Sequence, residues 1–252
     1  MFLTCAGSGS PTVVLISGTA GGADEWTELP AGSAAASARP VFSALAATTR
    51  VCSYDRPGTI RNDGSPTPTT PVTQPTNALQ GVQDLDRLLA AGGETGPYLL
   101  VGASWGGLIA QLFARAHPDD VDGLVLVDSA SAFLRETLSP TQWDAWMAVN
   151  TAAHDRAPEA ESPAYEQALR EMAAAPPPRS IPATVLSSDQ PWDLGVTPGA
   201  STWPAWLAAQ ADLADALHAT HVSITHSGHG IQVEQPALVS EAIRAVLDSA
   251  RR

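Results

Sequence analysis

The chain has 252 residues, and its 26 acidic side chains outnumber 13 basic ones to give a formal net charge of −13. A chain of this length suits one α/β domain with an insertion. The acidity argues against nucleic acid or an anionic membrane as a partner, because both attract basic surfaces. We also expect no membrane span, since the sequence has no run of about 18 apolar residues.

The first residues, Met1 to Cys5, carry neither the charged segment nor the long apolar segment of a signal peptide. This slightly favours a cytoplasmic location. Secretion stays open, because an upstream segment can be missing from this sequence.

The first third of the chain alternates apolar runs with turn residues. Residues 2–6 predict a short strand, and the β-branched run at residues 12–16 predicts a central one. Small residues at 17–22 follow it, and they allow the backbone to approach a ligand closely. A helix is expected within residues 26–47, and a strand with its exit turn at residues 50–58.

The middle of the chain holds its most informative stretch. Residues 64–76 are rich in Pro, Thr and Ser and predict a loop, and residues 77–91 predict an amphipathic helix. Residues 98–101 form an apolar run typical of a buried parallel strand. Residues 108–116 have a helical apolar pattern. Strand and helix are joined by the sequence GASWG at residues 102–106.

This junction has the G-x-S-x-G pattern. A sharp turn between a strand and a helix holds the serine in a strained backbone conformation, which is tolerated only where its neighbours are small. The glycines and the alanine around Ser104 supply that room. The turn raises the Ser104 hydroxyl above the end of the sheet, beside the positive N-terminus of the helix.

A second buried strand is expected at residues 123–127, and it ends at Asp128. Residues 129–180 then depart from the alternation of strands and helices, and their aromatic residues recur at helical spacing. We interpret this region as a helical cap inserted over the catalytic face. The remaining elements are expected at residues 181–187 (strand), 203–219 (helix), 220–225 (strand) and 236–250 (helix).

The chain resembles the α/β-hydrolase family in three segments. These are the turn around Ser104 at residues 102–106, called the elbow below, the segment YDRPG at residues 54–58 and the ending SGHG at residues 227–230. The resemblance extends over nearly the whole chain. It implies an α/β fold with a mostly parallel central sheet, helices on both faces and a helical cap insertion. It divides the chain into a first core part at residues 1–128, a cap at 129–180 and a second core part at 181–252.

The resemblance also implies a catalytic base after the last strand. His229 matches this position, and the glycines on both sides suit a loop that presents an imidazole. Ser104 would then be the nucleophile. His226, three residues earlier, is the local alternative to His229.

The acid that orients the base has three candidates. Asp128 follows the strand next to the nucleophile strand, as in some lipases, dehalogenases and lactonases of this fold, and we favour it. Most members of the family carry the acid after the penultimate strand, where Asp189 and Asp193 stand. Neither fits the usual spacing well, but both stay open.

Two backbone N–H groups are expected to hold the oxyanion. One belongs to Trp105, directly after the nucleophile, and the other to Thr19 in the glycine-rich loop. In that loop Ser17 replaces the histidine that is usual in the family. The family uses the Asp-Arg pair at residues 55–56 to brace loops, and we interpret it as structural.

The predicted function is hydrolysis of a carboxylic ester or lactone through an acyl-enzyme. Seven tryptophans, several of them in or after the cap, indicate a substrate with an apolar or aromatic group. The alternatives are C–C hydrolase, haloperoxidase or aminopeptidase chemistry, or a small-molecule receptor that keeps the triad. Expected substrate contacts are Gly18, Ala20, Phe133, Trp143, Trp146, Met147 and Trp192.

No cofactor or metal is expected. The six histidines lack the paired spacing of zinc motifs, and the sequence contains no phosphate-binding or dinucleotide-binding loop. The expected partner is a small-molecule substrate, and the oligomeric state stays open. The family's strand order would place Cys5 and Cys52 on neighbouring strands, where a bridge is geometrically possible. We favour two separate thiols, because bridges between adjacent strands are often strained.

Overall fold

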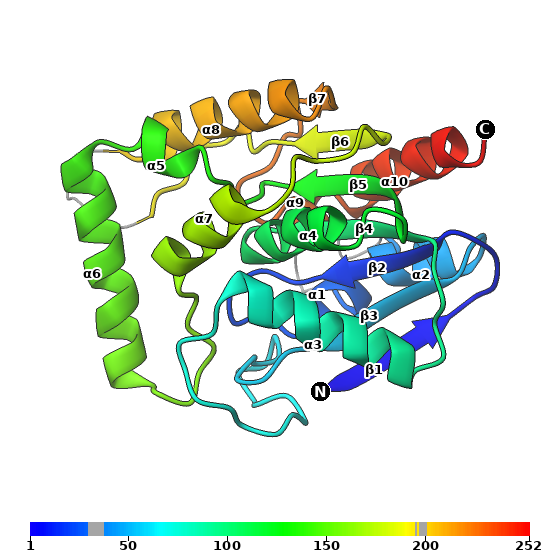
Figure 1. Cartoon of the computed structure of the whole chain (residues 1–252), viewed down its shortest axis with the longest axis horizontal. Helices are drawn as coiled ribbons and strands as arrows, with labels where there is room; N and C mark the ends of the chain where they lie inside the picture. The colour runs from blue at the N-terminus through cyan, green and yellow to red at the C-terminus, as the bar shows by residue number, and fades with distance from the viewer. Residues whose placement is uncertain (30–37, 195, 197–200) are drawn as a thin grey trace.

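The core of the chain is a seven-stranded sheet with the strand order β1-β3-β2-β4-β5-β6-β7 (Figure 1). The computed structural model describes residues 1–29, 38–194, 196 and 201–252. The first strand pairs antiparallel with β3, and the other neighbouring pairs are parallel. The strands are β1 (Phe2–Ala6), β2 (Thr12–Ile16), β3 (Val51–Asp55), β4 (Tyr98–Ala103), β5 (Val121–Val127), β6 (Ala183–Leu186) and β7 (Thr220–Val222).

Helices cover both faces of this sheet, as the pattern of buried residues on β2 requires. Val14 and Ile16 pack into one core cluster with α3, α4 and α8, while Val13 and Leu15 pack into another with α1, α2 and α10. Successive side chains of a strand point to opposite faces, so a fully apolar strand needs a helical layer on each. The helices are α1 (Asp24–Thr27), α2 (Val41–Ala46), α3 (Ala78–Ala91), α4 (Trp105–Ala116), α5 (Leu134–Thr137), α6 (Pro140–Arg156), α7 (Tyr165–Ala174), α8 (Trp203–Ala216), α9 (Ile231–Glu234) and α10 (Pro236–Ala250).

The helices α5, α6 and α7 lie in the segment between β5 and β6. Figure 1 shows α6 beside the end of the sheet to which the arrowheads of β2, β5 and β6 point. The ring of Tyr165 joins this segment to the core, since its centroid lies 5.1 Å from that of Trp105 in α4, and within the segment it lies 4.4 Å from that of Trp146. The segment therefore stands at the edge where the parallel strands end.

Most predicted elements are confirmed, with differences in their extent. The region expected to hold a helix at residues 26–47 contains α1 and α2, and residues 30–37 of it lie outside the described residues. The helix α2 begins directly after Pro40, which cannot extend a helix toward its N-terminus. The strand β7 is three residues shorter than expected, because it is an edge strand and pairs only with Thr184–Leu186 of β6. Within the described ranges, no helix has the length and apolar character that crossing a bilayer requires.

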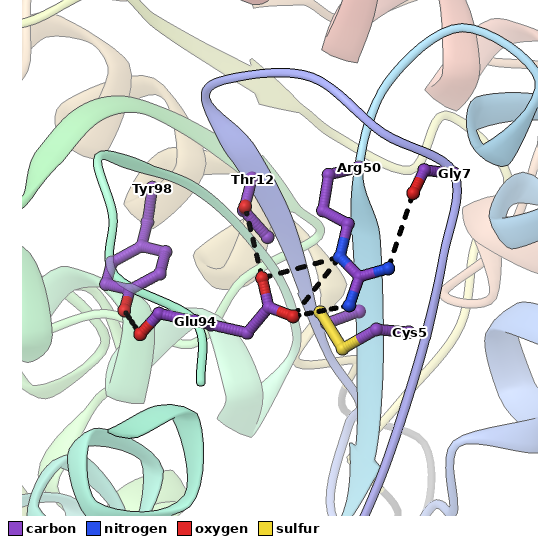
Figure 2. Close-up of a disulfide and its surroundings, with 7 residues drawn as sticks. Cys5, Gly7, Thr12, Arg50, Glu94 and Tyr98 are labelled. Atoms are coloured by element: carbon purple, nitrogen blue, oxygen red, sulfur yellow. Dashed lines mark hydrogen bonds and ion pairs between the residues drawn. A yellow bond between two sulfur atoms is a disulfide. The ribbon is translucent and has the colours of Figure 1, made fainter. Parts of the chain in front are cut away.

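The expectation of two separate thiols is wrong, because Cys5 and Cys52 form a disulfide. The antiparallel register places the two residues directly opposite each other on β1 and β3, with their Cα atoms 4.1 Å apart. Beside the bridge, Arg50 forms an ion pair with Glu94 and donates a hydrogen bond to the carbonyl oxygen of Gly7 (Figure 2). The disulfide and the hydrogen bond from Arg50 to Gly7 O attach the edge strand to β3, while the ion pair joins the start of β3 to the loop before β4.

We expect the Cys5→Ser, Cys52→Ser double variant to lose about 2–4 kcal/mol of unfolding free energy, a typical value for a native disulfide. The bridge closes a loop with a sequence separation of 47 residues, so it restricts the unfolded chain. Urea unfolding of wild type and variant measures the difference. Free thiols found by titration of the denatured, unreduced protein would contradict the bridge.

Candidate active site

Ser104 occupies a strained turn between β4 and α4. Its φ of 48° and ψ of −119° lie outside the ordinary regions for a residue with a side chain. The backbone on both sides of the turn is held, because Ser104 donates its N–H to Val127 O at 3.1 Å and its carbonyl accepts the N–H of Ala130 at 2.9 Å. Ser104 is partly exposed, whereas the other residues from Tyr98 to Ala114 are buried.

Glycines make this tight turn possible, because neighbouring backbone segments approach them more closely than a side chain would allow. A Cβ on Gly102 would lie 2.5 Å from the carbonyl oxygen of Gly106. A Cβ on Gly106 would overlap the carbonyl oxygens of Ile16 and Ser17 at the end of β2. The elbow therefore packs backbone against backbone, which brings the turn next to the loop that follows β2.

His229 and Asp128 face each other across the end of β5. The distance from His229 Nδ1 to Asp128 Oδ2 is 2.7 Å, and Asp128 is fully buried. The second carboxylate oxygen of Asp128 accepts hydrogen bonds from the backbone N–H and the hydroxyl of Ser188, at 3.0 and 3.2 Å. Trp192 stacks on the imidazole, with its ring centroid 4.1 Å away. With Nδ1 held by Asp128, Nε2 is the ring nitrogen available to a nucleophile.

Most N–H groups of the loop after β2 have an acceptor within the protein. Gly18 donates to Glu25 Oε2 at 3.0 Å, Ala20 to Glu161 Oε2 at 2.7 Å, Gly21 to Gly18 O at 3.2 Å and Gly22 to Ile60 O at 2.9 Å. Among the described residues no acceptor is found for the N–H of Thr19. Trp105 is the first residue of α4, so its N–H has no acceptor within the helix.

These groups line a common cavity of about 350 Å³. Ser104 and His229 both contribute to its wall, together with Gly18 and Thr19. Four aromatic rings contribute to the wall, Trp146 and Tyr165 from the segment between β5 and β6, Trp192 from the segment before α8 and Trp206 from α8 itself. The remaining lining residues are Glu25, Ala103, Asn150, Leu194, Gly230 and Gln232. The arrangement places a hydroxyl, an imidazole paired with a carboxylate, and the N–H of Thr19 around one space.

Comparison with protein families identifies the fold. A family model described as the alpha/beta hydrolase fold matches residues 11–162, which is more than half of the chain. The chain belongs to the α/β-hydrolase family. Among curated proteins, this α/β-hydrolase is 36% identical over 88 residues to an uncharacterised protein of Schizosaccharomyces pombe, and the match covers 34% of the chain but 15% of that protein.

Solved structures with the same fold include two enzymes that cover almost the whole chain. A thermophilic esterase from Thermogutta terrifontis is 21% identical, with a TM-score of 0.62, and the alignment covers 100% of this hydrolase and 94% of the esterase. The enol-lactonase of Burkholderia xenovorans is 19% identical, with a TM-score of 0.63 and coverage of 98% and 96%. At these identities the likeness establishes the fold alone.

The other predicted acids and the alternative histidine of this α/β-hydrolase lie elsewhere. Asp189 accepts the N–H of Ser227 at 2.9 Å and lies 3.7 Å from His226, so it braces the loop before His229. Asp193 binds Thr202 at the start of α8. The side chain of His226 is 79% exposed, whereas that of His229 is 35% exposed.

The predicted substrate contacts separate into two groups. Gly18, Trp146 and Trp192 line the cavity. Ala20 and Met147 line neighbouring hollows, Trp143 is 1% exposed and packs on Trp146, and Phe133 packs against the core. Sequence reasoning missed Glu25, Asn150, Tyr165 and Gln232, because helical spacing alone does not tell which side of a helix meets the cavity.

Glu25 is the least expected of the residues in the cavity wall. Its carboxylate accepts hydrogen bonds from Gly18 N–H and from Gln232 Nε2, which joins the loop after β2 to α9. Burial raises the pKa of Glu25, although these hydrogen bonds and the nearby charges of Arg56 and His229 lower it in part. In the sequence no pattern distinguished Glu25 from a surface glutamate.

This raised pKa predicts a pH-dependent stability difference between wild type and Glu25→Gln. The folded protein holds the proton of Glu25 more tightly than the unfolded chain, so this group costs stability as the pH rises above about 4.5. We expect the unfolding free energy of wild type to fall relative to that of the variant as the pH rises above about 4.5. Urea unfolding at several pH values measures this, with the exposed Glu28→Gln as the control. A difference that is constant or rises with pH would contradict the shift.

Proposed function

We propose that this α/β-hydrolase is a serine hydrolase that cleaves carboxylic ester or lactone bonds through an acyl-enzyme. Ser104 is the nucleophile, His229 the general base and Asp128 the acid that orients it. The observation that carries the proposal is the shared cavity, in which the strained Ser104 and the Asp128-bound His229 contribute to one wall. Under the same proposal residues 129–180 are a cap over this cavity.

The chemistry follows from the groups around the cavity. Ser104 Oγ attacks the carbonyl carbon of the substrate while His229 Nε2 takes its proton, and Asp128 stabilises the imidazolium that forms. The oxyanion accepts hydrogen bonds from the N–H groups of Thr19 and Trp105, and each such donor is typically worth about 2.7–4 kcal/mol. His229 then gives its proton to the leaving alkoxide, and a water molecule activated by His229 hydrolyses the acyl-enzyme.

The cavity wall favours substrates with an apolar or aromatic group. Trp146 and Tyr165 come from the insertion, while Trp192 and Trp206 flank the imidazole. Flat aromatic side chains bury apolar groups over a large area. The esterase and the enol-lactonase with the same fold support ester and lactone substrates for this chain.

The test is a panel of p-nitrophenyl esters and lactones combined with labelling by a fluorophosphonate. We expect hydrolysis that favours aromatic or medium-length acyl groups over acetate, and a single phosphonyl adduct on Ser104 in the peptide mass spectrum. Ligand binding without turnover or labelling would favour the receptor alternative. Labelling of a different serine would overturn the assignment of the nucleophile.

A further inference from the structure

The loop after β2 is held by a buried ion pair whose two members are far apart in the sequence. Arg56 follows β3, and Glu161 lies in the insertion, just before α7. Arg56 is 4% exposed and Glu161 is 6% exposed. The guanidinium meets the carboxylate in a two-point contact, with Nη2 2.9 Å from Oε2 and Nε 2.5 Å from Oε1. Burial alone would lower the pKa of Arg56, but Glu161 raises it above its usual value.

Arg56 donates hydrogen bonds to the carbonyl oxygens of the two peptide groups that precede Thr19. Its Nη1 donates to Ser17 O at 3.0 Å and its Nη2 donates to Gly18 O at 2.7 Å. Gly18 O and the N–H of Thr19 belong to the same peptide group. Because that group is planar and trans, its N–H points opposite to its carbonyl. A guanidinium that fixes Gly18 O therefore aims the N–H of Thr19 away from Arg56.

Glu161 acts on the following peptide group as well. Its Oε2 accepts the N–H of Ala20 at 2.7 Å, and Ala20 has a φ of 59°. A residue other than glycine rarely adopts this left-handed conformation, because its Cβ then comes too close to the following carbonyl oxygen. The hydrogen bond to Glu161 stabilises Ala20 there. Thr19 thus lies between two peptide groups that the ion pair holds.

We propose that Glu161 is a positioning residue for the oxyanion-binding N–H of Thr19, acting through Arg56 and Ala20. The inference rests on the proposed function, because it assumes that Thr19 binds the oxyanion. It also gives the insertion a part in catalysis besides lining the cavity. A side chain from the inserted segment holds the core loop on which the transition state would depend.

The first test is Glu161→Gln. The amide keeps one acceptor but loses the charge that pairs with Arg56, and its NH₂ group opposes the guanidinium. We expect kcat, normalised to the amount of phosphonate-labelled Ser104, to fall about tenfold or more, a part of the loss seen when an oxyanion donor is removed. KM should stay unchanged, while affinity for a trifluoromethyl ketone inhibitor falls with kcat. Glu159→Gln, an exposed glutamate in the same segment, is the matched control and should behave as wild type.

The second test separates positioning from stability. In the Arg56→Met, Glu161→Leu double variant no buried charge is left unpaired, so much of the stability lost in the single variant should return. We expect kcat to stay low, because neither peptide group is held. Recovery of kcat together with stability would overturn the proposal, as would a normal kcat in Glu161→Gln. The proposed function fails separately, if Ser104→Ala keeps wild-type turnover.

Discussion

Replacing Ser104 by alanine is expected to lower kcat/KM for p-nitrophenyl esters by about a thousandfold or more, because the acyl-enzyme cannot form without the hydroxyl. The residual rate comes from the oxyanion N–H groups and from the positioning of the bound substrate, which the substitution leaves in place. The strained turn is held by backbone hydrogen bonds to Val127 and Ala130, so the variant should fold normally.

Steady-state kinetics and thermal unfolding, measured on the same preparation, check both parts of this expectation. Ser43→Ala is a suitable control, because Ser43 is exposed on α2 and should behave as wild type in both measurements. Wild-type turnover by Ser104→Ala would remove the serine-hydrolase proposal altogether. A loss of turnover together with the loss of a cooperative thermal unfolding transition would instead show that the elbow needs the serine for folding.

The second large effect is expected at Asp128. Asp128→Asn should reduce kcat by about 10⁴-fold, because an amide whose oxygen binds Ser188 turns its NH₂ donor toward Nδ1 of His229, which favours the wrong tautomer, and it has no charge to stabilise the imidazolium. The amide oxygen can still accept the N–H of Ser188, which Asp128 Oδ1 binds at 3.0 Å. The structure around the site should therefore survive.

Asp189→Asn is the matched comparison, because both aspartates bind near the loop that carries His229. The Asp189 carboxylate accepts the N–H of Ser227 and lies near the exposed ring of His226, so its amide variant should keep turnover close to wild type. If Asp189→Asn were inactive and Asp128→Asn active, Asp189 after β6, and not Asp128 after β5, would be the acid that orients His229.

Local signals in the sequence identified the parts of the fold that depend on near neighbours. The apolar run at β4, the small residues around Ser104 and the helical pattern of α4 are adjacent in the chain, so their pattern predicts the elbow. The same holds for α3, which begins after Asn77, whose side chain accepts the N–H of Gln80 as an N-cap. The order of the strands was predicted from the family resemblance and not from these local patterns.

The tertiary structure decided what depends on register and on distant pairs. Spacing left Asp128, Asp189 and Asp193 open, and the paths of β5 and the histidine loop bring Asp128 to His229 across 101 residues. The register of β1 on β3 places Cys5 opposite Cys52. The ion pair of Arg56 with Glu161 likewise joins segments 105 residues apart. A sequence pattern indicates the burial and backbone preference of each segment, so the sequence by itself determined the elements and the elbow. Long-range packing sets which polar groups meet, so only the tertiary structure decided the partners of the charged groups.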